Sequence, residues 1–187
     1  MKLSRVYTQT ARAESMAATR QRIVEATVAA FGELPEVTLA DVAARAEVSV
    51  QTVLRHFGNR DKLIAEATST LVEERATPAG DPARAIRVLY DQYERRGDAN
   101  VRLLGKEDAD PHVKRLMDRG RAVHRDWVTQ VFAPALDARP PAARDALLDL
   151  LIVATDVYTW KLLRRDRGLS RRLAASRVKL LVDRVLQ

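Results

Sequence analysis

The sequence contains no cysteine, which excludes disulfides, thiolate metal ligands and a cysteine nucleophile. It has only three histidines, and no two of them stand four residues apart, as a helical zinc-binding pair requires. It also lacks a glycine-rich phosphate loop and any pattern that pairs a nucleophile with a base. We therefore expect no enzyme activity, no cofactor and no bound metal.

Long apolar runs are missing as well. No stretch approaches the ~20 apolar residues that a membrane-spanning helix needs. Residues 1–19 are polar and basic and lack the apolar core of a secretory signal. These features predict a cytoplasmic protein that does not associate with a membrane.

Alternating apolar and polar runs long enough to build a sheet are absent, and proline and glycine cluster between segments of helical periodicity. Pro82, Pro111 and Pro141 stand where helices can begin, and Pro134 should end or kink a helix. The sequence thus predicts an all-α fold, with helices near 15–32, 38–46, 49–57, 59–76, 82–96, 99–108, 110–133, 141–166 and 170–186.

The net charge of +7 is not concentrated in one part of the chain. Residues 1–60 carry eight basic and six acidic side chains, and the remainder carries 24 and 19. This distribution supports affinity for polyanions only weakly. Lys2, Arg5, Arg12 and Arg20 could form a basic arm that follows DNA phosphates or enters a minor groove. A start of the chain without any such role fits the sequence equally well.

The most informative segment begins at Thr38. This residue is a good N-cap, and Asp41 follows it by three positions, from which its side chain can bond back to the cap. Ser49 is a second N-cap, and Val53 and Phe57 then form the buried stripe of another very short helix. Two short helices joined by a tight turn are typical of a helix-turn-helix, whose second helix enters the DNA major groove.

The rest of that second helix carries side chains suited to reading bases. Gln51 can pair with adenine, Arg55 with guanine, and Val50 can meet a thymine methyl group. Residue types that contact phosphates, and so position a protein without reading sequence, surround them. The predicted DNA-binding set is Thr38, Arg45, Ser49, Val50, Gln51, Thr52, Leu54, Arg55, His56 and Arg60. The alternative interpretation is that these are solvated polar positions on a small helical bundle.

This segment resembles the DNA-binding region of the tetracycline-repressor (TetR) family. The resemblance rests on Thr38, Val42, Ala43, Ala46, Val48, Ser49, Thr52, Val53, His56, Phe57, Asn59, Arg60, Lys62 and Leu63. The helix before it fits too, with an apolar face formed by Ile23, Ala26, Thr27, Ala30 and Phe31. The resemblance implies three DNA-binding helices in residues 1–60 and six helices in residues 61–187, which form a ligand-responsive, dimerising domain.

The sequence departs from the family pattern at two positions in particular. Glu47 stands in the turn where the family usually has glycine. Either the turn is strained, by about 1 kcal/mol, or it has another shape. Leu54 stands where the family often has a tyrosine that touches the DNA backbone, so that contact cannot be carried over.

The last two predicted helices have a wider apolar surface than one core requires. Residues on both form the predicted dimer interface: Leu148, Ile152, Thr159, Leu163, Leu173, Leu181 and Val185. Two copies of the chain would bring two recognition helices to successive major grooves, about 34–36 Å apart on a near-palindromic site. The alternative is that both apolar stripes pack inside one subunit.

The resemblance also implies a small-molecule site in the second domain. Its candidate residues are Leu89, Tyr90, Tyr93, Leu104, Met117, His124, Trp127, Thr155 and Tyr158. Tyrosine and tryptophan are amphipathic, as pocket walls often are, although ordinary core packing is the competing interpretation for each residue. Asp156 stands in an apolar stretch, and a buried carboxylate there would need an arginine or a cationic ligand as its partner.

Together these features predict a homodimeric, sequence-specific transcriptional regulator of the bacterial cytoplasm and nucleoid, which binds double-stranded DNA at a near-palindromic operator. The resemblance implies a repressor that a small-molecule effector releases by favouring another arrangement of the dimer. Two alternatives stay open. One is a DNA-binding regulator without a ligand, and the other is a helical protein-interaction adaptor whose DNA-binding head is degenerate.

Overall fold

The computed structural model describes residues 3–34, 37–77 and 79–187, and the side chains of residues 3–13, 32, 71, 72 and 112 lie outside that description. Within these ranges the secondary structure is helical, without a strand, as predicted. The chain divides into two compact units, Met1–Leu71 and Val72–Gln187, whereas the sequence places the boundary after residue 60. No helix in the described ranges combines the length and the apolar character that a membrane span requires.

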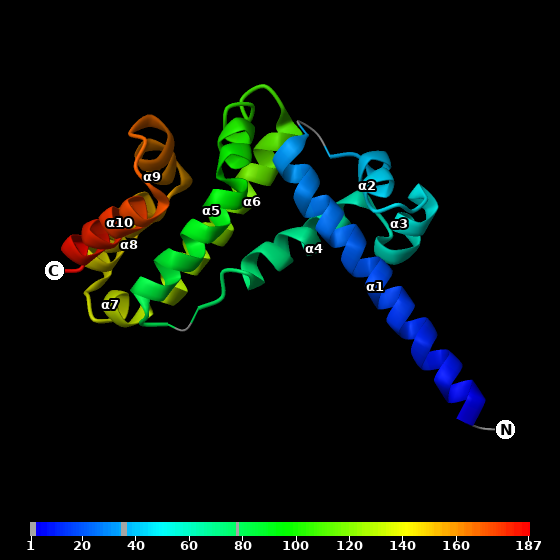
Figure 1. Cartoon of the computed structure of the whole chain (residues 1–187). Helices are drawn as coiled ribbons and strands as arrows, with labels where there is room; N and C mark the ends of the chain where they lie inside the picture. The colour runs from blue at the N-terminus through cyan, green and yellow to red at the C-terminus, as the bar shows by residue number, and fades with distance from the viewer. Residues whose placement is uncertain (1–2, 35–36, 78) are drawn as a thin grey trace. The chain divides into compact units, whose positions relative to one another are not determined.

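The first unit is built from short helices packed against one long helix. They are α1 (Leu3–Glu33), α2 (Leu39–Arg45), α3 (Val50–Phe57) and α4 (Arg60–Glu73), the last of which ends just inside the second unit (Figure 1). Their common core includes side chains that are at most 1% exposed: Ile23, Ala30, Val42, Val53, Leu63 and Ala67. Because helices as short as α2 and α3 are unstable alone, this core must hold them in place.

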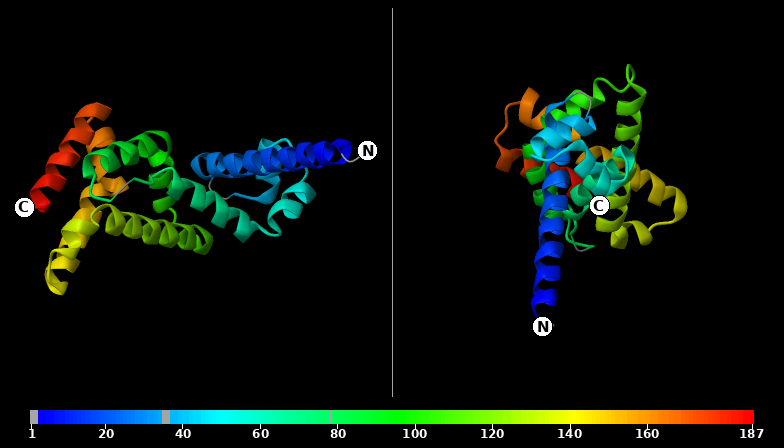
Figure 2. Two further views of the ribbon diagram at one scale, coloured as in Figure 1. Left: turned by 90° about the horizontal axis from the view of Figure 1, so that it is seen from below. Right: turned by 90° about the vertical axis from the view of Figure 1, so that its right-hand side faces the viewer.

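The long first helix differs from the prediction. It begins at Leu3 instead of residue 15, since no glycine or proline between them would stop it. Figures 1 and 2 show its first turns extending beyond α2 and α3. The predicted basic arm is therefore largely helical backbone, while the side chains of Lys2, Arg5 and Arg12 lie outside the described residues.

The second unit is a bundle of mostly longer helices. It contains α5 (Pro82–Leu104), α6 (Pro111–Val131), α7 (Ala133–Asp137), α8 (Pro141–Thr155), α9 (Val157–Lys161), the π-helix η1 (Leu162–Asp166) and α10 (Arg171–Val185). In Figures 1 and 2 α5 and α6 lie side by side, and α8 packs with α10. Prolines begin α5, α6 and α8 as predicted, and Pro134 stands at the start of α7, directly after α6 ends.

Two predicted helix boundaries in this unit are wrong. The expected break at Gly97–Asp98 does not occur, and α5 continues to Leu104. A Cβ atom on Gly97 would lie 2.5 Å from the indole ring of Trp160, so this glycine serves close packing and not a turn. Conversely, the helix expected over 141–166 breaks at Asp156, which ends α8 and caps α9.

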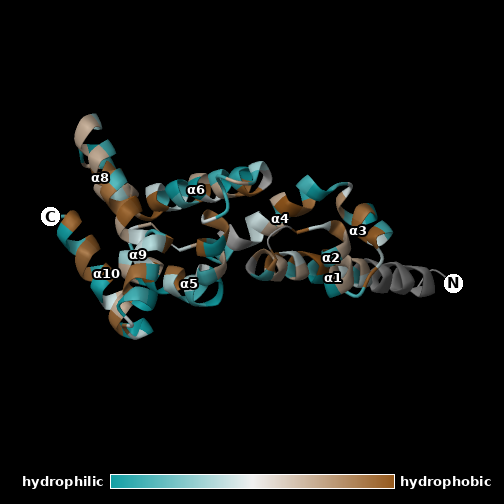
Figure 3. Cartoon of the chain, turned by 90° about the horizontal axis from the view of Figure 1, so that it is seen from above, coloured by the Kyte–Doolittle hydropathy of each residue, from teal (hydrophilic) through white to brown (hydrophobic). Residues whose placement is uncertain are grey.

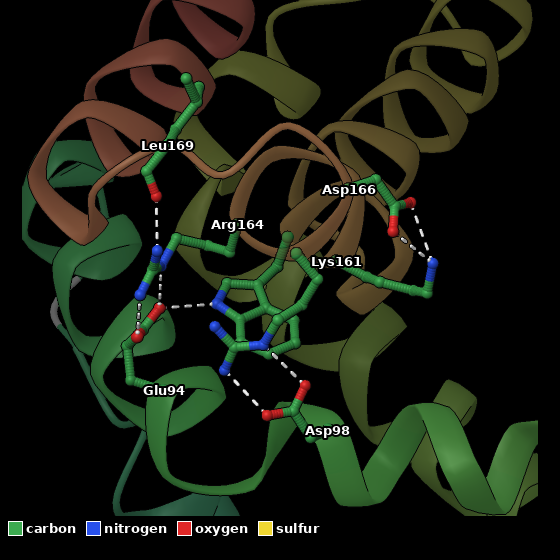
Figure 4. Close-up of polar contacts among 8 residues, drawn as sticks. Glu94, Asp98, Lys161, Arg164, Asp166 and Leu169 are labelled. Atoms are coloured by element: carbon green, nitrogen blue, oxygen red, sulfur yellow. Dashed lines mark hydrogen bonds and ion pairs between the residues drawn. The ribbon is translucent and has the colours of Figure 1, made fainter.

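Ion pairs hold η1 on α5, and a hydrogen bond from Trp160 holds α9 there (Figure 4). Arg164 Nε lies 2.6 Å from Glu94 Oε1, and Arg165 Nε lies 2.8 Å from Asp98 Oδ1. The same Glu94 oxygen accepts the indole N–H of Trp160 at 2.9 Å. These contacts fix the break after α8 and the direction of the residues that follow it.

Candidate nucleic-acid interface and regulatory core

The helix-turn-helix begins with a complete capping box at Thr38. The Asp41 N–H donates to Thr38 Oγ1 at 3.1 Å, and the Thr38 N–H donates to Asp41 Oδ2, also at 3.1 Å. Hydrogen bonds from the hydroxyl and the N–H of Thr38 hold the pKa of Asp41 below its ordinary value. The box satisfies two free N–H groups and fixes the start of α2. The Thr38 hydroxyl that could contact a phosphate is thus already engaged in the capping box.

The turn between α2 and α3 has the left-handed conformation for which glycine is the usual residue. Glu47 adopts it, with φ 54°. Its N–H donates to the Ala44 carbonyl at 3.3 Å, and the Val48 N–H donates to the Ala43 carbonyl at 2.9 Å. This is the Schellman pattern that ends a helix. Of the two possibilities raised by the sequence, the structure has the strained turn and not a turn of another shape.

α3 is fixed at both ends and along its inner face. Ser49 caps it by accepting the N–H of Thr52 at 3.1 Å, and Gly58, with φ 79°, ends it. Val53 and Phe57 point into the core and are 1% and 5% exposed, as the spacing predicts. The position of α3 in the first unit therefore does not depend on its own weak helix propensity.

The outer surface of α3 carries the residues predicted to read bases. Val50, Gln51 and Arg55 are exposed, while Thr52 and Leu54 are partly exposed. An amide, a guanidinium and an apolar side chain on one fixed helix match the donors, acceptors and methyl groups of the major groove.

Arg20 of α1 supports α3 from within the unit, a role that the sequence did not predict. Its guanidinium carbon lies 4.4 Å from the ring centroid of Phe57, and its Nη1 donates to the His56 carbonyl at 2.8 Å. Its other terminal nitrogen pairs with Glu66 of α4. The expectation that Arg20 belongs to a basic arm is wrong, because these contacts commit it to joining α1, α3 and α4.

Three residues of the predicted DNA-binding set are tied into the unit. Arg45 pairs with Glu33 at 2.8 Å, and Arg60 Nε donates to the Val37 carbonyl at 2.8 Å. His56 is partly buried, and burial together with two neighbouring arginines lowers the pKa of its imidazole. A neutral His56 could contact a phosphate only as a hydrogen-bond donor. Arg45 and Arg60 therefore help to position the helices, in addition to the DNA contacts predicted for them.

The residues predicted to form a ligand site lie mostly in the core of the second unit. The buried ones are Leu89, Tyr90, Tyr93, His124, Trp127 and Thr155. Leu104 and Met117 are partly exposed. Tyr158 is 53% exposed and does not line this core, because the break at Asp156 turns the following residues onto another face.

A polar cluster lies around Arg75, which follows the end of α4 by two residues. The Arg75 Nε donates to Gln92 Oε1, and its Nη1 lies 3.5 Å from His124 Nδ1. The guanidinium carbon is 5.7 Å from the ring centroid of Tyr93. Trp127 donates its indole N–H to the Arg75 carbonyl at 3.2 Å. Side chains of α5 and α6 thus converge on one arginine of the connecting segment.

His124 in this cluster is neutral and has a defined tautomer. Its Nε2 lies 3.2 Å from Thr155 Oγ1, and the Thr155 hydroxyl donates to the Leu151 carbonyl at 2.7 Å. The threonine oxygen must therefore accept from Nε2–H, which leaves Nδ1 as an acceptor toward Arg75. Burial and the charge of Arg75 lower the pKa of His124 to about 4.

Sequence reasoning missed Arg75 and Gln92. Arg75 stands in a polar stretch that resembles an ordinary linker, and an arginine there gives no local signal. Gln92 gives a weak one, because it is a buried polar residue beside Tyr93 on the apolar face of α5.

Asp156 does not lie within a continuous helix, as the sequence analysis assumed. Its Oδ1 accepts the N–H of Tyr158 at 2.8 Å, as the N-cap of α9. Burial raises the pKa of Asp156, and the bond from Tyr158 opposes that rise. The partner of this carboxylate is thus a backbone N–H rather than the arginine or cationic ligand expected.

Large apolar side chains are exposed on α8, α9, η1 and α10, and we call them the apolar surface; Figure 3 colours the ribbon by hydropathy, with brown for apolar residues. They are Leu150, Val153, Tyr158, Leu162, Leu173, Leu180 and Leu181, between 37% and 64% exposed. Of the predicted interface residues, Leu173 and Leu181 belong to this set, and Ile152, Thr159, Leu163 and Val185 are partly exposed. Leu148 is 2% exposed and packs in the core of its own subunit, so its placement in an interface is wrong.

Known proteins share this architecture. The family model for bacterial regulatory proteins, tetR family, matches residues 23–67, which include α2 and α3. The fold is similar to that of a transcriptional regulator from Rhodococcus sp. Rha1, with a TM-score of 0.59 and 21% sequence identity over 90% of this chain and 96% of that chain. At this identity the similarity concerns the fold alone. No curated protein matches the sequence significantly.

Proposed function

The chain belongs, through the domain in residues 23–67, to the tetR family of bacterial regulatory proteins, and from this premise we propose that it is a homodimeric repressor released by a small-molecule effector. The family makes the protein a DNA-binding transcriptional regulator. The proposal adds the dimer, the sign of regulation and the response to a ligand.

The outer surface of α3 is the observation that carries the proposal. Val50, Gln51 and Arg55 are exposed on a helix whose other side is fixed by Phe57 and Arg20. A fixed helix loses little conformational entropy when it binds, so its exposed side chains can discriminate between bases. The left-handed turn at Glu47 favours a working DNA-binding head over a degenerate one, because the chain keeps the helix-turn-helix geometry despite the strain.

The apolar surface supports the dimer. Soluble monomers rarely expose many large apolar side chains together, and a second copy of the chain would cover those on α8 and α10. Two-fold symmetry would also give the protein two recognition helices for the two halves of a near-palindromic operator.

The segment after α4 supports a response to a ligand. α4 begins in the first unit, and the chain then enters the cluster of Gln92, Tyr93, His124 and Trp127 around Arg75. A molecule bound at this cluster would contact the residues that directly follow α4. It could release DNA only by the difference in its affinity for the two arrangements of the dimer.

Selection of bound fragments from random double-stranded DNA, at physiological salt and with excess competitor, tests the proposal. We expect a near-palindromic consensus, whose half-site spacing gives the separation of the two heads. Binding without a consensus that vanishes as salt rises would contradict sequence-specific regulation. A reporter placed behind the selected site then distinguishes a repressor from an activator.

A further inference from the structure

Arg75 is a cation that has no carboxylate partner among the described residues. It is only partly exposed, and the groups around its guanidinium are neutral: the amide oxygen of Gln92, His124 Nδ1 and the ring of Tyr93. Burial lowers the pKa of Arg75, although arginine stays charged in proteins. A charge removed from water without a counter-ion costs free energy, so a protein retains one mainly where it serves binding or catalysis.

The two carboxylates whose charges act on Arg75 are engaged elsewhere. Glu74, the preceding residue, pairs with Arg96 Nη1 at 2.7 Å and with Arg95 Nη2 at 3.3 Å. Asp156 accepts a backbone N–H at the start of α9. Neither carboxylate forms an ion pair with Arg75 in the described structure, so the counter-ion of Arg75 is not supplied by these groups.

The geometry of the guanidinium suits an external anion. Of its nitrogen atoms, Nε donates to Gln92 and Nη1 lies near His124, while Nη2 has no hydrogen bond to a described residue. A guanidinium has five N–H donors in a planar fork that matches a carboxylate. The flanking groups are aromatic, since Tyr93 lies beside the fork and Trp127 stacks on His124 with ring centroids 5.6 Å apart.

We propose that Arg75 recognises the carboxylate group of a small effector whose apolar or aromatic body packs against Tyr93, His124 and Trp127. The inference rests on the proposed ligand response and names the chemical class of its effector. His124 stays neutral beside the arginine and accepts from it, so it adds no second positive charge and no competing anion.

The position of Arg75 also indicates how such a ligand would act on the first unit. Its carbonyl is held by the indole N–H of Trp127, and α4 ends two residues before it. A carboxylate that draws the guanidinium away from Gln92 or His124 changes the contacts of the segment continuous with α4. The ligand therefore biases the end of the helix that begins beside α3.

Calorimetric titration of the full chain with benzoate, phenylacetate, octanoate and decanoate, each against its primary amide, tests the proposal. At least one acid should bind at or below about 1 mM, and its amide at least ~10-fold more weakly, because only the acid offers a carboxylate to the fork. The comparison of acid with amide needs no variant. Arg75→Gln should abolish this preference, Arg75→Lys should keep part of it, and Arg87→Gln, an exposed arginine of α5, should leave it unchanged.

Equal binding of acids and amides, an unchanged preference in Arg75→Gln, or no binding of any acid would each overturn the inference. The selected DNA site keeps this result separate from the proposed function. If an amide or another neutral compound releases DNA, the proposed ligand response is supported and the carboxylate site at Arg75 is contradicted. Binding of an acid that depends on Arg75 but does not change DNA affinity would establish the site and contradict its regulatory role.

Discussion

Trp160 packs directly on the Cα of Gly97, so that a Cβ atom there would meet three atoms of the indole ring at 2.5, 2.6 and 2.8 Å. The indole cannot withdraw freely, because its N–H donates to Glu94 at 2.9 Å. We therefore predict that Gly97→Ala lowers the free energy of unfolding by about 1–3 kcal/mol through overpacking. Urea unfolding followed by circular dichroism measures the change.

Gly120 offers the matched control. It also lies inside a helix, α6, but it is exposed and a Cβ atom there has no neighbour within 4 Å. Gly120→Ala should raise the free energy of unfolding by up to about 1 kcal/mol, since alanine is the better helix former. Equal effects at the two glycines would contradict the role assigned to Trp160.

The sequence predicted correctly those features that depend on residues close together in the chain. The caps at Thr38 and Ser49 and the buried pair Val53 and Phe57 are set by residues within one helical turn, and the structure has all of them. Gly97 misled the prediction because a glycine followed by aspartate is also a turn signal. The reason for this glycine is Trp160, a residue distant in sequence, so only the packed structure reveals it.

The strained turn leads to a second prediction. Glu47 has a left-handed backbone conformation, with φ 54°, which costs free energy because the residue carries a Cβ atom. Glu47→Gly should therefore raise the free energy of unfolding by up to about 1 kcal/mol. Glu47→Ala removes the charge but keeps the Cβ atom, so it should bring no such gain. A stabilisation of the same size in the alanine variant would assign the effect to charge and not to backbone strain.

The exposed face of α3 should carry the reading of sequence. We predict that Gln51→Ala and Arg55→Ala each weaken binding to the selected DNA by about 1–3 kcal/mol, the contribution of one bidentate base contact, with little effect on random DNA. Fluorescence anisotropy at fixed salt measures both affinities. Gln21→Ala with Arg22→Ala, a matching exposed pair on α1, serves as the control. A uniform loss on all DNA would mean that α3 contacts phosphates only.

The apolar surface should hold two copies of the chain together. Val153 is 64% exposed on α8 and Leu181 is 43% exposed on α10. If both are buried by a second copy, Val153→Lys or Leu181→Lys places a charge in that interface and should raise the dimer dissociation constant at least ~10-fold. Analytical ultracentrifugation at several concentrations measures it. Met16→Lys, at an apolar residue 54% exposed in the first unit, should leave the constant unchanged. A wild-type monomer at micromolar concentration would exclude this interface.

The sequence predicted part of the cluster around Arg75 but not the arginine itself. His124, Trp127 and Tyr93 were predicted to share a site, since aromatic and amphipathic residues on helical faces suggest one, and they do share a cluster. The charge at its centre comes from a segment between helices, where periodicity carries no information. Which linker residue turns inward is decided by the partners on α5 and α6, Gln92 and Trp127 among them.

His124 should make the second unit sensitive to acid. Burial and the charge of Arg75 lower its pKa from 6.5 to about 4, so between these values the unfolded chain binds a proton that the folded chain does not. The contribution of neutral His124 to the free energy of unfolding is therefore fully present above about pH 6.5. It is lost as the pH falls toward 4, by up to roughly 3 kcal/mol.

Asp156, whose pKa is raised by burial, has the opposite effect: its contribution to the free energy of unfolding increases as the pH falls at the acid end of this range. Its contribution is also present in His124→Gln, so the difference in unfolding free energy between the two proteins isolates the histidine. As the pH falls from about 7.5 to about 4.5, the wild type should lose more unfolding free energy than His124→Gln. A difference that does not change with pH would mean that His124 has the same pKa in the folded and the unfolded chain, so that neither burial nor Arg75 lowers it.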